Sequence, residues 1–347
     1  MEFRRLGRTG LQVSALSFGA MTFGGGKGFG DVGNTGVAEA QTLTGLCIDA
    51  GVNLFDTADV YSQGQSEEIL GKALGNKRKD VLIATKAFGQ MRPGPNGLGA
   101  SRQHLTTACE DSLRRLGTDY IDLYQIHLFD ELVPIEETLR ACDDLVRAGK
   151  VRYIGVSNFT ASQLMKSLML SERQGLERIA SQQIYYSLAS REAEWELLRV
   201  SRDEEVGVLV WSPLAFGALS GKFRRGGNSN EGRASVMGAP GGAKVEDVYD
   251  IVDALDAIAK ERGATIAQVA LNYILHKPQV TSVLIGARNE TQLKDNLAAA
   301  AWRLTADEVA RLDKVSHRPL PYPYWHQATY GAARNPYYVA LAGAADD

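Results

Sequence analysis

The chain has 347 residues, enough for one large barrel or two ordinary domains, and enough to bury a substantial core. Its 38 Lys and Arg residues nearly balance its 41 Asp and Glu residues. This balance argues against a basic surface for nucleic acid or an anionic membrane. The N-terminus lacks an apolar signal segment, and no stretch is long enough to span a bilayer. We therefore expect a cytoplasmic protein with a small-molecule partner and with no nucleic-acid or membrane partner.

The cysteines do not have the spacing of a disulfide framework or a metal site. Cys47, Cys109 and Cys142 lie far apart, each in a helix-like segment with apolar neighbours. We expect three small buried thiols and no bound metal.

The chain begins with a pattern typical of a β-hairpin, because residues 3–13 alternate around a Thr-Gly turn. We expect this hairpin to plug the N-terminal end of a barrel. Beyond it, short runs rich in Val, Ile, Leu and Tyr alternate with amphipathic stretches, which is typical of a parallel sheet with helical crossovers. The expected strands span residues 16–20, 52–58, 81–86, 121–127, 153–158, 180–186, 208–213 and 282–287.

Helices are expected between these strands and after the last one. Ser66 before two glutamates predicts a helix start, and Gly149 predicts a helix end. Eight strand-helix units favour a closed (β/α)8 TIM barrel, forming a single domain over residues 1–347, rather than an open Rossmann sheet. The expected helices span residues 39–50, 66–74, 101–116, 134–148, 161–174, 192–204, 248–262, 265–276, 291–300 and 305–315.

The segment 24–30 (GGGKGFG) is rich in glycine, as is the G-x-G-x-x-G phosphate motif of a dinucleotide-binding sheet. Residues 31–35 are typical of a loop rather than of the helix that this motif requires, so we do not interpret the segment as a phosphate site. Three longer loops, 89–100, 221–243 and the tail from Ser316, exceed the usual length in a compact fold, which is typical of functional or mobile loops.

Four polar residues mark one end of three consecutive expected strands, where (β/α)8 barrels carry their catalytic groups. Asp56 ends the second strand and Tyr61 follows in its loop, while Lys86 and His127 end the third and fourth. When hydride attacks a carbonyl, the developing alkoxide needs a proton donor. A nearby Lys86 would lower the pKa of the Tyr61 phenol, and Asp56 would orient that lysine. His127 would hydrogen-bond the substrate oxygen.

Each of these residues also has an ordinary structural interpretation. A strand-end lysine often reaches to the surface, an aspartate caps a loop, and a buried histidine is structural. Their common position favours one site. A different chemistry remains open, in which Lys86 is the Schiff-base nucleophile of an aldolase; bound NADP would count against it.

The motifs around these residues are 53–58 (NLFDTA) with Tyr61, 84–86 (ATK), 119–127 (DYIDLYQIH) and 149–159 (GKVRYIGVSNF). In combination they resemble the aldo-keto reductase superfamily over nearly the whole chain. The resemblance implies NADPH-dependent reversible reduction of an aldehyde or ketone. In that family the positions of Asp56, Tyr61, Lys86 and His127 form the catalytic tetrad.

The chain is similar to the bacterial branch that resembles potassium-channel beta subunits. The sequence 211–217 (WSPLAFG), continuing to 220–222 (SGK), carries that similarity. A second function therefore stays open, namely an NADP-binding regulatory module that senses redox state and catalyses slowly.

The same resemblance implies an NADPH site across the barrel mouth. Ser157, Asn158 and Gln183 match residues that bind the nicotinamide carboxamide, and Trp211 matches the aromatic residue against its ring. The remaining implied cofactor contacts are Met21, Asp56, Ser212, Pro213, Leu214, Gly217, Ser220, Lys222, Arg233, Gly286, Arg288, Gln292 and Asn296.

Selectivity for the 2′-phosphate would rest on Arg288, because Gly286 stands where some family members have lysine. Backbone amides at the start of the following helix would favour the same anion. Use of both NADPH and NADH stays open.

Variable loops should supply the substrate pocket above Tyr61 and His127. The aromatic and apolar candidates are Met21, Phe23, Phe88, Phe129, Tyr322, Tyr324 and Trp325.

Overall fold

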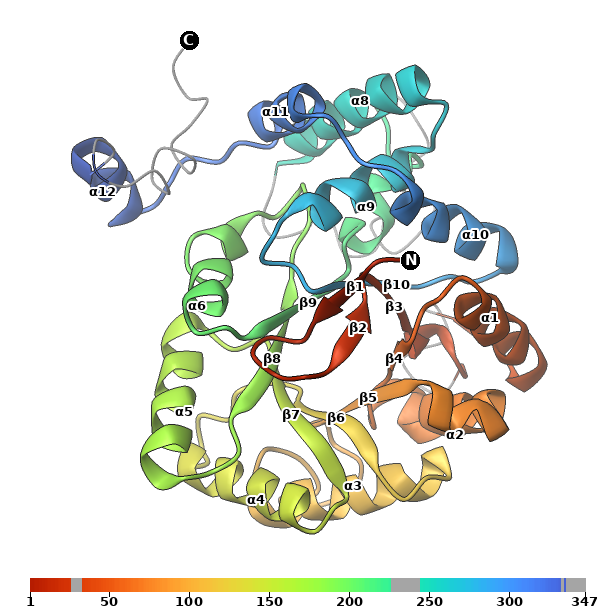
Figure 1. Ribbon diagram of the computed structural model, residues 1–347, viewed down its shortest axis with the longest axis vertical. Coiled ribbons are helices and arrows are strands. Elements are labelled where there is room, and N and C mark those ends of the chain that lie inside the picture. Colours follow the sequence, from red (N-terminus) through yellow and green to blue (C-terminus); the bar gives the residue numbers. More distant parts are fainter. Residues whose placement is uncertain (26–32, 226–243, 332–333, 335–347) are drawn as a thin grey trace.

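The computed structural model describes residues 1–25, 33–225, 244–331 and 334. Eight parallel strands close into a barrel in the order β10-β3-β4-β5-β6-β7-β8-β9, so the expected (β/α)8 fold is confirmed (Figure 1). Strands adjacent in the chain are adjacent in space, which gathers the loops that follow them at one mouth. The strands are β3 Leu16–Gly19, β4 Leu54–Asp56, β5 Leu82–Ala87, β6 Ile121–Ile126, β7 Val151–Ser157, β8 Ile179–Tyr185, β9 Gly207–Trp211 and β10 Ser282–Ile285.

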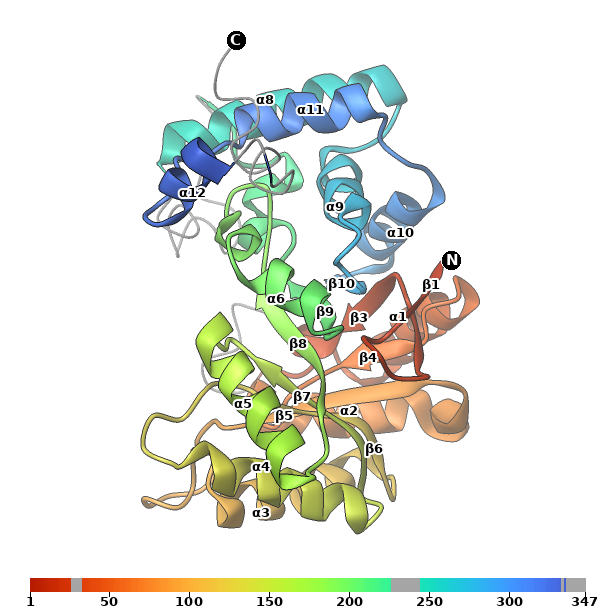
Figure 2. The ribbon, with the colours of Figure 1, turned by 60° about the vertical axis from the view of Figure 1, so that its left-hand side comes forward.

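Helices surround the barrel on its outer side (Figures 1 and 2). None within the described ranges is long and apolar enough to cross a membrane. The α-helices are α1 Val37–Asp49, α2 Gln65–Leu74, α3 Arg102–Leu116, α4 Ile135–Arg147, α5 Ala161–Gln174, α6 Leu197–Asp203, α8 Val245–Arg262, α9 Ile266–His276, α10 Glu290–Ala298, α11 Ala306–Val315 and α12 Tyr324–Gly331. Short 3-10 turns are η1 Ala20–Thr22, η2 Tyr61–Gly64, η3 Gly75–Asp80, η4 Glu192–Glu194, η5 Ala215–Ser220 and η7 Ala299–Ala301.

Two sequence predictions need correction. The continuous helix expected over 192–204 is wrong, because the chain forms η4 and then α6, with a non-helical backbone at Glu196 between them. Arg191 forms ion pairs with both Glu194 in η4 and Asp313 in α11, which ties η4 to the C-terminal helices. The tail from Ser316, which was expected to be a loop, contains a helix, α12. The Pro321 carbonyl accepts the first backbone hydrogen bonds of this helix.

The N-terminal hairpin forms as expected and plugs the barrel. Strand β1, Phe3–Arg5, pairs antiparallel with β2, Gln12–Ser14. Leu6 and Val13 are fully buried among apolar side chains from the barrel strands. Gly7 makes the turn at φ +57°, and a Cβ there would lie 2.5 Å from the Glu205 carbonyl oxygen, so the turn requires glycine.

Alternation along the strands gives the barrel interior an apolar floor and a polar upper layer. Residues two apart on a strand share one face. Leu54, Ala84 and Leu123 belong to the apolar cluster at the floor. The residues two positions further, Asp56, Lys86 and Gln125, are buried polar groups. The three cysteines are free and buried, as expected.

A buried ionic cluster joins the start of α2 to β5 and α3. Glu67 of α2 accepts hydrogen bonds from Thr85 Oγ1 of β5 at 2.6 Å and from Arg115 Nε of α3 at 2.6 Å. The Glu67 side chain has no exposed surface. Because η2 leads directly into α2, this cluster fixes the loop that carries Tyr61.

Asp59, two residues before Tyr61, is a second buried carboxyl beside this cluster. Neither of its oxygens has a well-formed hydrogen bond to any residue that the structure describes. Burial raises the pKa of Asp59 to about 8, and the Glu67 carboxylate adds to the rise. Arg115, Lys86 and the Val60 N–H oppose it by less.

Asp59→Asn should therefore stabilise the protein near pH 8, with a gain that shrinks toward pH 4. The folded wild type keeps a proton that the unfolded chain releases above about pH 3.9. Its free energy of unfolding falls as the pH rises from about 4 to about 8, and levels off above that. The variant loses this slope, which is at most about 1.4 kcal/mol per pH unit. Urea unfolding of both proteins at about pH 5 and pH 8 measures the free energy of unfolding of each. If the variant and wild type differ by the same amount at both pH values, folded Asp59 is ionised and the prediction is wrong.

Candidate active site

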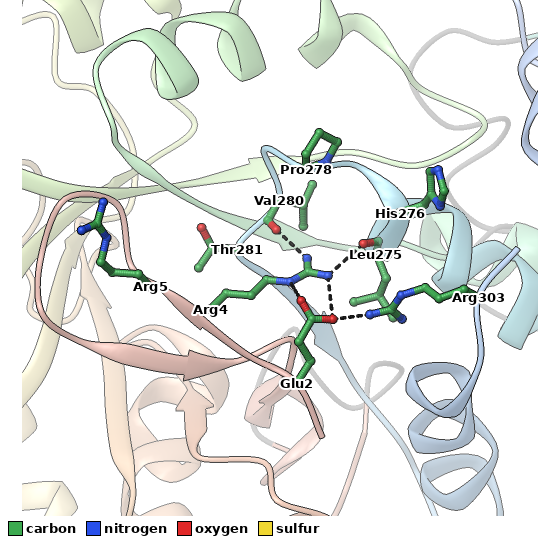
Figure 3. Close-up of a pocket in the computed structure, with 9 residues that line it drawn as sticks. All are labelled: Glu2, Arg4, Arg5, Leu275, His276, Pro278, Val280, Thr281 and Arg303. Carbon is green, nitrogen blue, oxygen red and sulfur yellow. Dashed lines mark hydrogen bonds and ion pairs between the residues drawn. The ribbon is translucent and has the colours of Figure 1, made fainter. Parts of the chain in front are cut away.

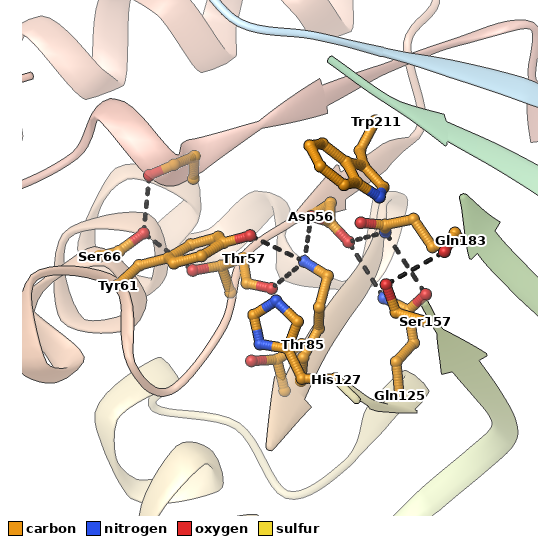
Figure 4. A network of polar contacts seen from close by, with 12 residues as sticks. Asp56, Thr57, Tyr61, Ser66, Thr85, Gln125, His127, Ser157, Gln183 and Trp211 are labelled. Atoms are coloured by element: carbon orange, nitrogen blue, oxygen red, sulfur yellow. Dashed lines mark hydrogen bonds and ion pairs between the residues drawn. The ribbon is translucent and has the colours of Figure 1, made fainter. Parts of the chain in front are cut away.

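The polar residues singled out in the sequence converge at the ends of β4 to β9. Asp56 ends β4, Lys86 lies in β5, and His127 follows β6 directly. Gln183 and Trp211 complete the ring from β8 and β9, and the side chains of Tyr61, His127, Gln183 and Trp211 surround Asp56 (Figure 4).

Lys86 links the other members of this group. Its Nζ donates to Asp56 Oδ1 at 2.5 Å and to the Thr57 carbonyl at 2.8 Å. A third, longer contact of 3.4 Å reaches the Tyr61 hydroxyl. The side chain of Lys86 is 0% exposed and that of Asp56 is 3% exposed. The ammonium is thus buried, paired and within reach of the phenol.

Tyr61 is positioned by a short turn with several anchors. Its backbone N–H donates to the Ala58 carbonyl. Ser62, in the left-handed region at φ 49°, donates its hydroxyl to the Phe23 carbonyl. Ser66 donates to the Ala20 carbonyl at 2.7 Å, which ties the start of α2 to η1. The phenol is therefore carried by a constrained loop.

The protonation of Tyr61 differs from the expectation based on Lys86 alone. Burial raises the pKa of the Tyr61 phenol, and the Lys86 ammonium lowers it by less, so the pKa lies above its ordinary value. The predicted influence of Lys86 has the right sign but is outweighed by burial. A protonated phenol at neutral pH is the form that can give up a proton.

Burial acts on the other two ionisable groups beside Tyr61 in different ways. Burial by itself lowers the pKa of Lys86, but Asp56 and Tyr61 reverse the direction and the ammonium form is favoured. Burial, with Lys86 nearby, lowers the pKa of His127 to about 3, so this imidazole is neutral. Its ring meets that of Tyr61 edge-on at 5.8 Å between centroids. A neutral imidazole can donate a hydrogen bond without carrying charge.

Asn158 and Ser157 form a connected amide and hydroxyl group beside the tetrad. Asn158 Nδ2 donates to the His127 carbonyl and to Ser157 Oγ, each at 3.1 Å. Its Oδ1 accepts from Trp211 Nε1 at 3.0 Å. Asn158 is an exposed residue and has a left-handed backbone, with φ 58°. The set offers the donors and acceptors that a carboxamide needs.

Trp211 stands in an aromatic group at the end of β9. The centroid of its ring lies 4.7 Å from that of Tyr185, with 31° between the ring planes, and 5.9 Å from that of Phe216. Asn158 fixes the indole through the bond to Nε1. A half-buried, fixed ring of this kind can stack against a flat ligand.

The loop after β9 is compact as far as the described residues reach. Ser212, at φ 51°, accepts from the Phe216 N–H, and Ser220 donates to the Gly217 carbonyl. Pro213 is buried and Leu214 half-buried, while Lys222 is exposed. Arg233 lies outside the described residues.

The start of α10 brings together the residues predicted for the 2′-phosphate. The Arg288 N–H donates to Gln292 Oε1, and Asn289 caps the helix by accepting from the Gln292 N–H. Asn296 donates to the Gly286 carbonyl at 3.1 Å, and Arg288 is exposed. Because these two N–H groups are already bonded, the exposed Arg288 is the residue here that suits an anion.

The residues predicted to line a substrate pocket lie in different surroundings. Phe23 has no exposed surface and packs against Phe18, so it belongs to the core rather than to an open wall. Phe129 is half-buried and packs edge-on against Phe159. Met21 and Phe88 are also half-buried.

The tail aromatics lie on or next to α12, which is at the edge of the molecule in both views (Figures 1 and 2). Tyr322 and Trp325 are exposed, while Tyr324 stacks on Trp195 at 6.3 Å between ring centroids. This stack places the tail beside the loop that follows β8.

Gln125 is a member of the polar layer that the sequence analysis missed. It lies on β6, is fully buried, and donates to Asp56 Oδ2 at 3.1 Å. The signal was present, since a glutamine inside an apolar strand, two residues before His127, shares its interior face.

Cavities at the opposite end of the barrel do not compete with this site. A cavity of about 500 Å³ is lined by Glu2, Arg4, Arg303 and the segment before β10 (Figure 3). Glu2 pairs with both arginines, and Arg4 also donates to the Val280 and Leu275 carbonyls. Residues at the N-terminal end of a barrel usually serve stability.

Comparison with known proteins agrees with the motifs. The sequence model of the Aldo/keto reductase family matches residues 15–317. The chain is 38% identical over 307 residues to a probable voltage-gated potassium channel subunit beta of Arabidopsis thaliana, over 86% of this chain and 91% of that protein. It is 36% identical over 330 residues to the uncharacterized oxidoreductase YrpG of Bacillus subtilis, over 92% and 97% respectively.

A third relative carries the name of an enzyme. The chain is 33% identical over 335 residues to the versiconal hemiacetal acetate reductase of Aspergillus parasiticus, over 90% of this chain and 96% of that protein. The family match contains Asp56, Tyr61, Lys86 and His127 and covers most of the sequence. The chain therefore belongs to the aldo/keto reductase family.

Proposed function

We propose that this protein is an NADPH-dependent reductase that converts an aldehyde or ketone to an alcohol, reversibly, with Tyr61 as the proton donor. The observation that carries the proposal is the position of Lys86 Nζ, 2.5 Å from Asp56 Oδ1 and 3.4 Å from the Tyr61 hydroxyl. A paired ammonium beside a buried phenol is the arrangement that general acid catalysis by tyrosine requires.

Each of the four tetrad residues has its own role in the proposed reaction. Tyr61 gives its proton to the oxygen of the substrate, and Lys86 stabilises the phenolate that remains. Asp56 keeps Lys86 in place and balances its charge. His127 is neutral, so it donates a hydrogen bond to the same oxygen and orients the carbonyl. When bound, NADPH supplies the hydride.

The polar groups beside the tetrad fit the nicotinamide end of this cofactor. Ser157, Asn158 and Gln183 would hold the carboxamide, and Trp211 would lie against the ring. Arg288 at the capped start of α10 would bind the 2′-phosphate, which favours NADPH over NADH. The proposal also takes the chain as one barrel domain that works in the cytoplasm on a small carbonyl compound.

A second candidate function follows from the relatives named as channel beta subunits. In that case the protein would bind NADP and report redox state to a partner, with slow catalysis. Rapid turnover on simple aldehydes would decide for the enzyme. The aldolase alternative fits the site less well, because a Schiff-base lysine needs a neutral amine and the pKa of Lys86 is raised by Asp56 and Tyr61.

Tyr61→Phe should reduce carbonyl reduction by about 100-fold or more while NADPH binding stays within about twofold. The ring and its packing remain, and only the proton is lost. Steady-state kinetics with a panel of aldehydes and ketones, together with NADPH fluorescence titration, measures both. Tyr120→Phe is the matched control, because Tyr120 lies just before β6 and at its opposite end from His127. Full activity of Tyr61→Phe would refute the mechanism.

Arg288→Ala should raise the KM for NADPH by about tenfold or more and leave the KM for NADH nearly unchanged. The lost guanidinium contact involves a phosphate that only NADPH carries. Arg303→Ala removes an exposed arginine at the other end of the barrel and serves as the control. Equal rises in the KM for NADPH and for NADH would show that Arg288 does not bind the 2′-phosphate.

A further inference from the structure

The amide of Gln125 completes the shell of Asp56. Lys86 occupies Oδ1 of that carboxylate, whereas two amides share Oδ2: Gln125 Nε2 at 3.1 Å and Gln183 Nε2 at 2.8 Å. All of these side chains are buried. A carboxylate inside a barrel needs such donors, because each unbonded lone pair loses its water without compensation.

Gln125 and Gln183 also contact each other. Gln183 Nε2 donates to Gln125 Oε1 at 3.4 Å, in addition to its bond with Asp56. Both amide hydrogens of Gln183 therefore have acceptors inside the barrel. An amide has its oxygen opposite its NH2 group, so this pattern leaves Gln183 Oε1 as the end that can accept a hydrogen bond from a ligand.

The residue beside Gln125 on the next strand has no side chain. Gln125 pairs in register with Gly155 of β7. A Cβ at Gly155 would lie 3.1 Å from Gln125 Cγ and 2.8 Å from Ser181 Oγ. The glycine thus allows the side chain of Gln125 to reach Asp56 across the interior.

We propose that Gln125 is a positioning residue, which holds Asp56 against Lys86 and sets the Gln183 amide with its oxygen toward the nicotinamide carboxamide. This inference rests on the proposed reductase function. Gln125 touches neither substrate nor cofactor in this role. It acts through Asp56 on the ammonium beside Tyr61, and through Gln183 on the nicotinamide end of the cofactor.

The main test compares Gln125→Leu with Gln182→Leu. Gln182 is the matched control, since it is equally buried but lies on the outer face of β8, where it donates to the Leu197 carbonyl. Gln125→Leu should lower kcat by about tenfold or more, as for the loss of a hydrogen bond to a charged group. Gln182→Leu should stay within about twofold of wild type, and thermal melting should show both variants folded.

Binding separates the two ends of the cofactor. Gln125→Leu should weaken NADPH binding several-fold and leave the binding of 2′,5′-ADP unchanged, because that compound has the adenosine bisphosphate but no nicotinamide. Titration calorimetry with both ligands measures this. Equal weakening of both, or kinetics and binding that match those of Gln182→Leu, would overturn the proposal.

A second variant keeps the shape of the side chain and changes its charge. Gln125→Glu places a carboxyl against Asp56, within a group that also contains Lys86, Tyr61 and His127. Like charges this close cannot both ionise at no cost. Its activity relative to wild type should therefore fall as the pH rises and recover toward low pH, whereas a parallel profile would contradict the proposed contact.

Failure of the function and failure of this inference give different results. If wild type reduces no carbonyl in the panel, the reductase proposal fails. The comparison of NADPH with 2′,5′-ADP still decides the role of Gln125, because it needs no turnover.

Discussion

The arrangement of polar side chains at the barrel mouth depends on the ion pair of Lys86 and Asp56. Both side chains are almost completely withdrawn from water, and removing two charges from water costs several kcal/mol each. Their attraction offsets this cost only when the remaining donors and acceptors are also bonded. The Thr57 carbonyl and the amides of Gln125 and Gln183 meet that condition. The ammonium is consequently fixed 3.4 Å from the Tyr61 hydroxyl.

The rest of the fold supports this pair from two directions. Below it, Leu6 and Val13 of the hairpin seal the apolar floor. Behind it, Glu67 joins Thr85 of β5 to Arg115 of α3 and so holds the start of α2, next to the turn that carries Tyr61. A loop with few anchors would let the phenol drift, and a displacement of about 1 Å can cost 100-fold in rate.

The relatives include proteins named as channel subunits and a protein named as a reductase. A buried ion pair is weak evidence for stability, since apolar residues of similar volume often fold at least as well. Features that do not favour stability, such as buried charges, tend to occur at functional sites. The presence of Lys86, Asp56, Tyr61 and His127 in one place therefore favours chemistry over a purely structural role.

The sequence alone determined the strand-helix repeat, the hairpin and the strand-end positions of the tetrad, because local periodicity and turn residues encode them. It did not show the break at Glu196 in the helix expected over 192–204, where Arg191 pairs with Glu194 in η4 and with Asp313 in the distant helix α11. Nor did it show that burial raises the pKa of Tyr61 by more than Lys86 lowers it. It also did not show that the amides of Gln125 and Gln183 both donate to one oxygen of Asp56. Those features depend on distances between residues up to 127 positions apart, and only closure of the barrel sets them.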